Sequence, residues 1–195
     1  MIKPIFGIMI ITISGKPGSG KSTVARIVAK KLGLKHYSIG DLWRKMAAER
    51  NMTILQFNKL SEKDPDVDLE TDKRQQELGK KEDNFVIDGR MSFHFIPNSV
   101  KIFLDVDDRV GADRIFQQKR GDVENYPDIE ETMERLWRRE QSELKRYRKL
   151  YKTDYTNTKN FDAVIDTTKI PADKVADRVL QAVNMIKEAK RKQNL

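Results

Sequence analysis

Hydrophobic residues along this chain form short runs that alternate with longer amphipathic stretches. The runs at 85–87 (Phe-Val-Ile) and 102–104 (Ile-Phe-Leu) are apolar at every position, which is typical of strands buried on both faces of a parallel sheet. The intervening stretches repeat apolar residues every three or four positions, as one face of an α-helix does. The pattern predicts strands at 8–13, 35–38, 85–88, 101–106 and 163–166, and helices at 22–32, 40–50, 53–60, 66–81, 107–119, 128–150 and 172–190.

The alternation predicts one α/β domain over residues 1–195, with a five-stranded parallel sheet between two layers of helices. Two segments depart from simple strand–helix alternation: the polar helical stretch 38–83 and the charge-dense stretch 119–152. We therefore divide the domain into these two inserts and a core, which comprises 8–37, 84–118 and 153–190.

Composition narrows the classes of protein that the chain can represent. Apolar residues make up 38% of the 195 residues and charged residues 35%, which suits a charge-rich globular protein and argues against disorder. The chain has no cysteine, so disulfides and thiolate metal sites are excluded. Its formal charge of +8 favours polyanionic partners, either nucleotide phosphates or nucleic acid.

The apolar stretch at 1–13 has one lysine and raises the question of a signal peptide. It has no small-residue cleavage site, leads directly into a glycine-rich loop, and is too short to span a bilayer. We expect it to contribute the first strand, and we expect a cytoplasmic protein with no membrane partner.

A phosphate-binding loop follows that first strand. Residues 15–22 (Gly-Lys-Pro-Gly-Ser-Gly-Lys-Ser) match G-x-x-x-x-G-K-[ST] in full, between a strand and a helix as the motif requires. Glycines let backbone N–H groups turn toward phosphate, and the helix N-terminus adds partial positive charge. We predict that the loop binds ATP or GTP together with Mg²⁺, with the Lys21 ammonium on the β- and γ-phosphates and the Ser22 hydroxyl on the metal. The residues expected to hold the nucleotide are Gly15, Lys16, Pro17, Gly18, Ser19, Gly20, Lys21, Ser22 and Thr23.

Polar residues also follow the second and third predicted strands, at the edge where open α/β sheets bind ligands. The segment 38–44 (Ser-Ile-Gly-Asp-Leu-Trp-Arg) ends in Arg44, and Asp88-Gly89 precedes Arg90. These two arginines are placed to clamp an acceptor phosphate opposite the donor. We expect Asp88 to orient the water shell of Mg²⁺, with the capping of the next turn as the alternative. Asp41 is equally well placed to cap a helix.

A third group of candidates lies on the long helix predicted at 128–150. Arg139, Glu143 and Arg146 are spaced i, i+4 and i+7, so they share one helix face. The two guanidiniums can grip phosphate oxygens while the acid orients an arginine or accepts from a ribose hydroxyl. The alternative is a solvated helix face with ordinary i, i+4 ion pairs.

Taken together, these segments resemble the cytidylate (CMP/dCMP) kinases, in their short archaeal form, among the P-loop nucleoside monophosphate kinases. The resemblance rests on S-x-G-D-x-x-R at 38–44 and on Asp88-Gly89-Arg90, where adenylate kinases carry Asp-Gly-Phe-Pro-Arg. It rests also on the segments 72–75 and 139–147, and it covers about residues 9–186. The chain departs from many bacterial members at 91–93, where Met-Ser-Phe replaces Asp-(Met/Ile)-Gly.

The resemblance implies transfer of the γ-phosphoryl group of ATP to CMP or dCMP, with 38–83 as the monophosphate-binding insert and 119–152 as a mobile lid that excludes water on closing. It implies that Lys21, Arg120 and Arg139 act on the transferred phosphoryl group and that Arg114 lies against the adenine of ATP. For Arg114 and Arg120, an ordinary surface position is the alternative. The residues it implies for the acceptor are Ser38, Gly40, Asp41, Arg44, Arg74, Asp88, Gly89, Arg90, Arg139, Glu143 and Arg146. A monomer is expected.

Two other functions stay open at this point. A small kinase for another acceptor (AMP, UMP or a non-nucleotide) differs only in its base pocket, which sequence describes poorly. A P-loop ATPase that binds RNA or DNA is favoured only by the net charge. We expect no nucleic acid partner, because the arginines cluster around the predicted pocket and no interleaved basic and aromatic platform is present.

Overall fold

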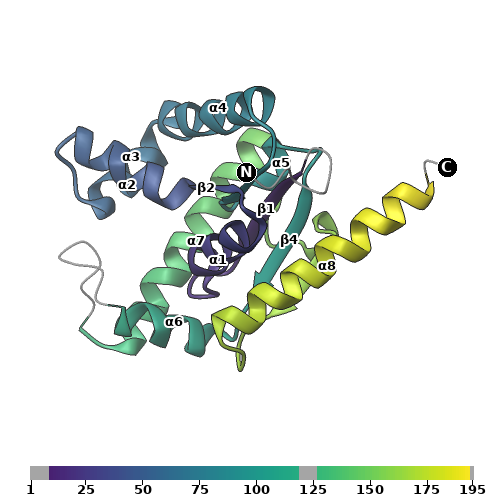
Figure 1. The fold of residues 1–195 in the computed structure, drawn as a ribbon. Helices are drawn as coiled ribbons and strands as arrows, with labels where there is room; N and C mark the ends of the chain where they lie inside the picture. Colours follow the sequence, from purple (N-terminus) through teal and green to yellow (C-terminus); the bar gives the residue numbers. More distant parts are fainter. Residues whose placement is uncertain (1–8, 119–126, 194–195) are drawn as a thin grey trace.

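The computed structural model of the chain describes residues 9–118 and 127–193 (Figure 1). The elements in chain order are β1 (Ile10–Gly15), α1 (Lys21–Leu32), β2 (Lys35–Ser38), α2 (Ile39–Glu49), α3 (Ile54–Lys63), α4 (Pro65–Lys81), β3 (Phe85–Asp88), α5 (Ser92–Phe95), β4 (Val100–Asp105), α6 (Asp108–Gln117), α7 (Ile129–Tyr151), the 3-10 turn η2 (Thr158–Asn160), β5 (Ala163–Asp166) and α8 (Ala172–Gln193). Every element expected from the sequence is present, and its bounds agree within three residues at each end.

The sheet confirms the predicted parallel α/β architecture. Its five strands run in the order β2-β3-β1-β4-β5, and all four pairings are parallel. The register pairs Ile13 with Asp88 and Ser38 with Asp88, so the carboxyl ends of β1, β2 and β3 meet at one edge. This edge therefore holds the three loops that the sequence marked as chemically active.

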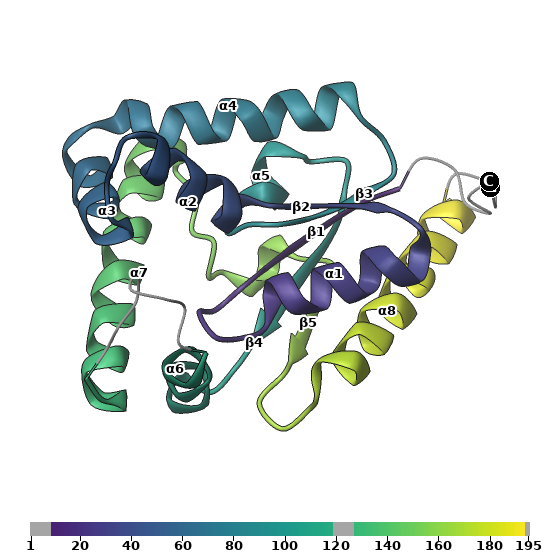
Figure 2. The ribbon, with the colours of Figure 1, turned by 60° about the vertical axis from the view of Figure 1, so that its left-hand side comes forward.

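Helices cover both faces of the sheet. On one face α1 and α8 lie side by side (Figures 1 and 2) and bury Ile11, Val28 and Val179 in the larger hydrophobic cluster. On the other face Phe85 and Ile87 of β3 pack with side chains of α5, α7 and the segment before η2. Strand residues thus alternate between two cores, as expected for a sheet that helices cover on both sides.

Helices α2, α3 and α4 lie within 38–83, the segment expected to be an insert, and they group together away from α8 (Figures 1 and 2). They have a hydrophobic cluster of their own, centred on Met46, Phe57 and Val67. Helix α3 begins with a capping box, in which Thr53 and Gln56 bond each other's backbone N–H groups. The insert therefore has both local start signals and an apolar core to hold it.

Helix α7 combines two environments along its 23 residues. Its first half carries exposed ion pairs such as Glu131–Arg135 and Glu134–Arg138. Its second half is anchored in the core, because Leu144, Tyr147 and Tyr151 pack in the cluster of β3 and α5.

The division of the chain into core, insert and lid stays a prediction, and Arg120 lies outside the described residues.

Like the 3-10 turn η2, helix α5 is an element that the sequence did not predict. Its four residues are too few to show a helical period. One buried residue, Met91, separates it from Arg90. The departure from the bacterial pattern at 91–93 therefore coincides with a buried turn of helix.

Within residues 9–118 and 127–193, no helix combines the length and apolar character needed to cross a membrane.

Candidate active site

The phosphate-binding loop lies between β1 and α1 and is shaped by glycines. Gly18 has φ 72° and Gly20 has φ 82°, in the left-handed region that glycine adopts without strain. A Cβ atom on Gly18 would lie 2.1 Å from the carbonyl oxygen of Gly111, so the loop packs directly on α6. No side chain among the described residues caps α1, and its first turn has no acid. The N–H groups at this helix end are therefore open to an anion.

Lys21 supplies the half-buried amine of this loop. Its Nζ donates to the carbonyl oxygens of Gly15 at 2.9 Å and Lys16 at 2.6 Å. Burial and the nearby positive charge of Arg90 lower the pKa of Lys21 to about 7. An arriving phosphate would compensate both effects, since it supplies negative charge to a poorly solvated amine.

Asp88 joins the loop to the neighbouring strands. It is buried, and its Oδ1 accepts from the hydroxyls of Ser22 at 2.7 Å and Ser38 at 3.1 Å. Its Oδ2 lies 2.7 Å from Nε2 of His36. Asp88 thus faces Ser22 as a metal role requires, and its oxygens are held by side chains. His36 was not among the residues expected at the site, so its contact with Asp88 was not foreseen.

The pair Ser22–Asp88 fits a magnesium ion. A hydroxyl and a carboxylate are hard oxygen donors, and Mg²⁺ in nucleotide enzymes takes few protein ligands because phosphates and waters complete its shell. Among the described residues there is no group of three His, Cys, Asp or Glu side chains placed to hold a metal by themselves.

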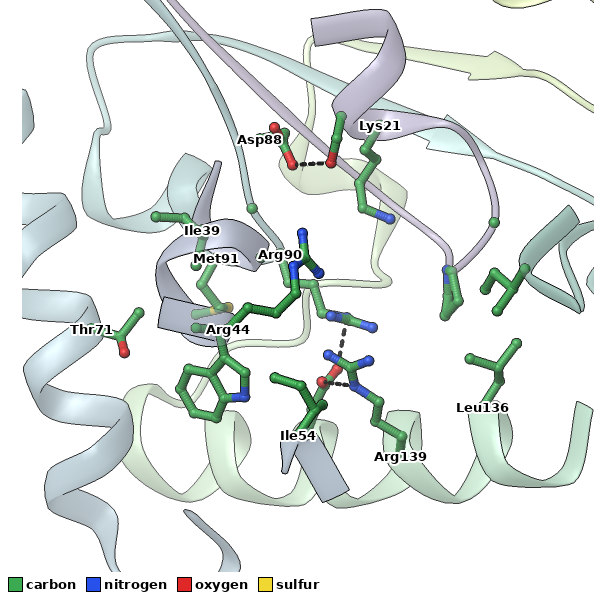
Figure 3. Close-up of a pocket in the computed structure, with 18 of the residues that line it drawn as sticks. Lys21, Ile39, Arg44, Ile54, Thr71, Asp88, Arg90, Met91, Leu136 and Arg139 are labelled. Atoms are coloured by element: carbon green, nitrogen blue, oxygen red, sulfur yellow. Dashed lines mark hydrogen bonds and ion pairs between the residues drawn. The ribbon is translucent and has the colours of Figure 1, made fainter. Parts of the chain in front are cut away.

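Three guanidiniums gather in front of Lys21, from Arg44, Arg90 and Arg139 (Figure 3). They come from α2, the turn after β3, and α7. Nε of Arg90 lies 2.6 Å from Oε2 of Glu143, and Nε of Arg139 donates to Oε1 of the same carboxylate at 2.9 Å. Glu143 thus contacts two of the three cations, and Asp41 pairs with the third, Arg44. Three guanidiniums face two carboxylates, so excess positive charge remains to attract an anion.

Glu143 is the buried counter-ion of this cluster. Burial by itself would raise the pKa of Glu143, but the charges of Arg90, Arg139 and Arg146 outweigh it and hold that pKa below its ordinary value. The Tyr155 hydroxyl donates to its Oε2 at 3.3 Å. The solvated-helix interpretation of this face is therefore wrong, since the carboxylate is only 6% exposed.

Arg146 shares the helix face and lines the same pocket, as predicted, but it binds another acid. Its Nε donates to Oδ2 of Asp68 on α4 at 2.7 Å, and a terminal nitrogen donates to Ser142 at 2.7 Å. The sequence could not reveal this partner, because Asp68 lies 78 positions away and on another helix.

The acceptor side of the pocket begins at α2. Ser38 caps this helix, since its Oγ accepts from the backbone N–H of Asp41 at 3.4 Å. The cap alternative for Asp41 is therefore wrong. Asp41 instead forms an ion pair with Arg44. A Cβ atom on Gly40 would lie 3.6 Å from the Arg44 guanidinium, an ordinary van der Waals distance, so Gly40 lies directly beside that arginine.

Arg114 and Lys16 are both tied to neighbouring loops. Arg114 donates to the carbonyl oxygens of Thr167 at 2.8 Å and Thr168 at 3.0 Å, and more weakly to that of Gly18. It therefore connects α6 to the phosphate-binding loop and to the segment after β5, which argues against an ordinary surface position. Lys16 pairs with Asp108 at 3.1 Å, so its side chain is directed toward α6.

Three of the residues expected at the acceptor do not line the pocket: Ser38, Asp41 and Arg74. Arg74 is on an exposed face of α4, where it pairs with Glu70 at 2.7 Å. Its neighbours Asp72 and Gln75 are instead buried and line the pocket. The geometry of the helix explains why Asp72 and Gln75 line the pocket and Arg74 does not, because residues 72 and 75 share one face of α4 and residue 74 points to another. The signal was available in the sequence as four polar residues at helical spacing: Asp68, Thr71, Asp72 and Gln75.

With this geometry in view, the chain was compared with known proteins. The sequence pattern of the cytidylate kinase-like family matches residues 10–169. The chain belongs to the cytidylate kinase-like family. The cytidylate kinase of Methanocella arvoryzae is 40% identical over 181 residues, which cover 93% of this chain and 100% of that protein. The cytidylate kinase of Methanothermobacter thermautotrophicus is 38% identical, and the match covers 85% of this chain and 99% of that protein. The cytidylate kinase of Archaeoglobus fulgidus is 39% identical, and the match covers 92% of this chain and 97% of that protein.

Solved structures support the fold of this cytidylate kinase-like protein. An uncharacterised protein of Eubacterium ventriosum has a TM-score of 0.67 at 18% identity and covers 90% of this chain and 98% of its own. The shikimate kinase of Bacteroides thetaiotaomicron has a TM-score of 0.64 at 14% identity, with 91% and 99% covered. At such identities the likeness concerns the fold and not the substrate.

Proposed function

We propose that this member of the cytidylate kinase-like family transfers the γ-phosphoryl group of ATP to CMP or dCMP, giving ADP and (d)CDP. Donor and acceptor sites open into one pocket, which the phosphate-binding loop lines on one side and α2, α4 and α7 on the other. The family match and the relatives named cytidylate kinase support the choice of acceptor.

The roles of the residues follow from charge and position. Arg44, Arg90 and Arg139 hold the acceptor phosphate, and Glu143 keeps two of them in place. Lys21 neutralises the transferred group, while the backbone of the loop holds the donor phosphates. The acceptor phosphate is already ionised near neutral pH, so positioning and charge neutralisation supply the catalysis and no strong general base is needed.

Magnesium belongs to the proposal as well. Ser22 would hold the ion directly and Asp88 would orient its water shell, because their oxygens lie 2.7 Å apart beside the loop. When bound, Mg²⁺ neutralises charge on the donor phosphates. Arg120, the closing lid, the monomeric state and the cytoplasmic location are retained as parts of the proposal.

The observation that carries the proposal is the convergence of three guanidiniums on the space in front of Lys21 (Figure 3). The test is ADP release from ATP and Mg²⁺ with CMP, dCMP, UMP, AMP and GMP supplied separately, against a blank without acceptor. We expect strong stimulation by CMP and dCMP. Stimulation by another nucleotide alone would overturn the choice of acceptor. A flat panel with steady ATP hydrolysis would overturn the nucleoside monophosphate kinase assignment and favour a nucleic-acid-binding ATPase or a kinase for a non-nucleotide acceptor.

Variants locate the acceptor phosphate within the pocket. Arg139→Ala removes one of the converging guanidiniums and is expected to lower kcat/KM for CMP by at least about 100-fold, as loss of a charge-assisted contact to a transferring phosphate does. Arg148→Ala is the matched control, since Arg148 lies on the same helix and pairs with Asp154 at the surface. Equal kinetics in the two variants would place Arg139 outside the site.

A further inference from the structure

A buried polar stripe on α4 faces the pocket beyond the arginine cluster. Asp68, Thr71, Asp72 and Gln75 are spaced i, i+3, i+4 and i+7, and each is at most 3% exposed. All four line the pocket that also contains Lys21 and the guanidiniums. Buried carboxylates require donors, so this stripe needs an explanation beyond the packing of α4.

Asp72 is held as an acceptor by two neighbours. The Tyr151 hydroxyl donates to Oδ2 at 2.6 Å, and Nε2 of Gln75 donates to Oδ1 at 3.1 Å. The Ser92 hydroxyl donates to Oε1 of Gln75 at 2.7 Å, which fixes the amide with its nitrogen toward Asp72. Each carboxylate oxygen then keeps a lone pair that can accept from a ligand.

Asp68 adds an acceptor that lacks a donor. Its Oδ2 accepts from Arg146, whereas its Oδ1 is fully buried and has no hydrogen-bond partner within the described part of the chain. Burial raises the pKa of Asp68 despite Arg146, and burial raises the pKa of Asp72 to about 7, with Asp68 as a neighbouring negative charge. Both carboxylates would gain from a donor supplied by a ligand.

The position of the stripe matches the nucleoside end of an acceptor. Along α7, Glu143 marks the phosphate cluster, Arg146 faces Asp68, and Tyr151 faces Asp72. The helix rises about 12 Å from Glu143 to Tyr151 at about 1.5 Å per residue. A nucleotide whose phosphate contacts the arginines would therefore extend its base toward Asp72.

We propose that Asp72, with Oδ1 of Asp68 beside it, reads the base of the acceptor by accepting hydrogen bonds from the 4-amino group of cytosine. Uracil carries a carbonyl oxygen at this position. This oxygen and the carboxylate oxygens are all hydrogen-bond acceptors, so the site would reject uracil. The inference rests on the proposed kinase function and adds to it the residue that selects the base. Asp72 is thus a specificity-determining residue, set apart from the phosphate-binding arginines.

The test compares three acceptors and three forms of the protein. The acceptors are CMP, UMP and the CMP analogue that has hydrogen in place of the 4-amino group. For the wild-type protein we expect kcat/KM for CMP to exceed that for UMP and for the analogue by at least about 100-fold, because a site built for a hydrogen bond discriminates strongly against its absence.

Asp72→Asn supplies an amide that can donate to the 4-oxo group of uracil. We expect the CMP to UMP ratio of kcat/KM to fall at least about tenfold in this variant, with an absolute gain for UMP. Glu77→Gln is the matched control, since it makes the same chemical change on the exposed face of α4, where Glu77 pairs with Lys81. The control should keep the wild-type ratio.

The outcomes separate this inference from the proposed function. A wild-type protein that does not phosphorylate CMP would overturn the function itself. A wild-type preference for CMP that persists unchanged in Asp72→Asn would overturn the role of Asp72 and leave the function standing. If that variant does not fold, the analogue decides: its use by the wild-type protein as efficiently as CMP overturns the inference, and its rejection supports it.

Discussion

The surroundings of Lys21 favour the neutral form of its amine until a negatively charged ligand binds. In the free protein its Nζ is satisfied by two backbone carbonyls, and burial with Arg90 nearby lowers its pKa to about 7 from an ordinary 10.5. At pH 8 the amine is therefore mostly neutral, whereas donor phosphates would favour the ammonium form.

This shift predicts that ATP binding takes up a proton. At pH 8, calorimetry in two buffers of different ionisation enthalpy should report an uptake approaching one proton per ATP, and the uptake should shrink below pH 6, where Lys21 is already charged. Lys21→Met should bind without that uptake. A binding enthalpy that is the same in both buffers would contradict the prediction.

Glu143 is the second residue whose charge is decisive. Substitution by glutamine leaves the half-buried guanidiniums of Arg90 and Arg139 without the buried Glu143 carboxylate, so Glu143→Gln should lower the free energy of unfolding by about 3 kcal/mol. Inorganic phosphate should raise the melting temperature more in this variant than in the wild-type protein, because an anion replaces the lost charge.

The control for Glu143 is Glu134→Gln on the same helix. Glu134 pairs with Arg138 in solvent, and such pairs contribute less than about 1 kcal/mol. Urea denaturation of both variants with and without phosphate makes the comparison. Equal losses of stability in the two variants would mean that the ion pairs of Glu143 contribute no more to stability than the exposed pair of Glu134.

At the scale of elements, the contact between the phosphate-binding loop and α6 is unusually close. A Cβ atom on Gly111 of α6 would lie 2.7 Å from the carbonyl oxygen of Pro17. Helix propensity favours alanine over glycine by about 1 kcal/mol in an exposed helix interior. Here the backbone of the loop blocks that gain, so packing and propensity make opposite predictions.

We expect packing to dominate in Gly111→Ala. The variant should lose roughly 1–3 kcal/mol of stability through overpacking, and its KM for ATP should rise because the loop is displaced. Arg109→Ala, which removes an exposed side chain from the same helix, should change neither quantity appreciably. A more stable Gly111→Ala protein with unchanged ATP kinetics would show that the loop accommodates the methyl group.

At the scale of the whole molecule, the buried carboxylates of α4 make stability depend on pH. Asp72 has a folded pKa of about 7 against an ordinary 3.8, with Asp68, Arg146 and Tyr151 as the ionisable groups around it. Between these values the folded state binds more protons than the unfolded state. The contribution of Asp72 to stability therefore falls as pH rises from about 4 to about 7, by a few kcal/mol.

Asp72→Asn should remove this component. The stability of the variant relative to the wild-type protein should increase from pH 4 to pH 7 and level off above that, when both are unfolded in urea without nucleotide. The difference between the two proteins is the informative quantity, because Glu143 and other groups titrate in both. A difference that does not vary with pH would contradict the raised pKa.

The sequence by itself determined the architecture and the donor site of this protein. Apolar runs and helical periods are local signals, and they placed every strand and helix of the described residues except α5 and the 3-10 turn η2, which are too short to show a period. The phosphate-binding loop was equally legible, since its glycines, Lys21 and Ser22 act within one stretch of chain. Arg44, Arg90 and Arg139 were found because the ends of parallel strands and the face of a helix can be inferred from order alone.

Only the tertiary structure decided which distant charges meet. It paired Arg146 with Asp68, linked Asp88 to His36 and Ser38, and turned Asp72 and Gln75 into the pocket while Arg74 faced outward. The physical reason is that a motif records neighbours along the chain, whereas burial and ion pairing depend on how α4 and α7 pack against each other. Which side chains of α4 and α7 meet therefore depends on a contact between helices that no local pattern encodes.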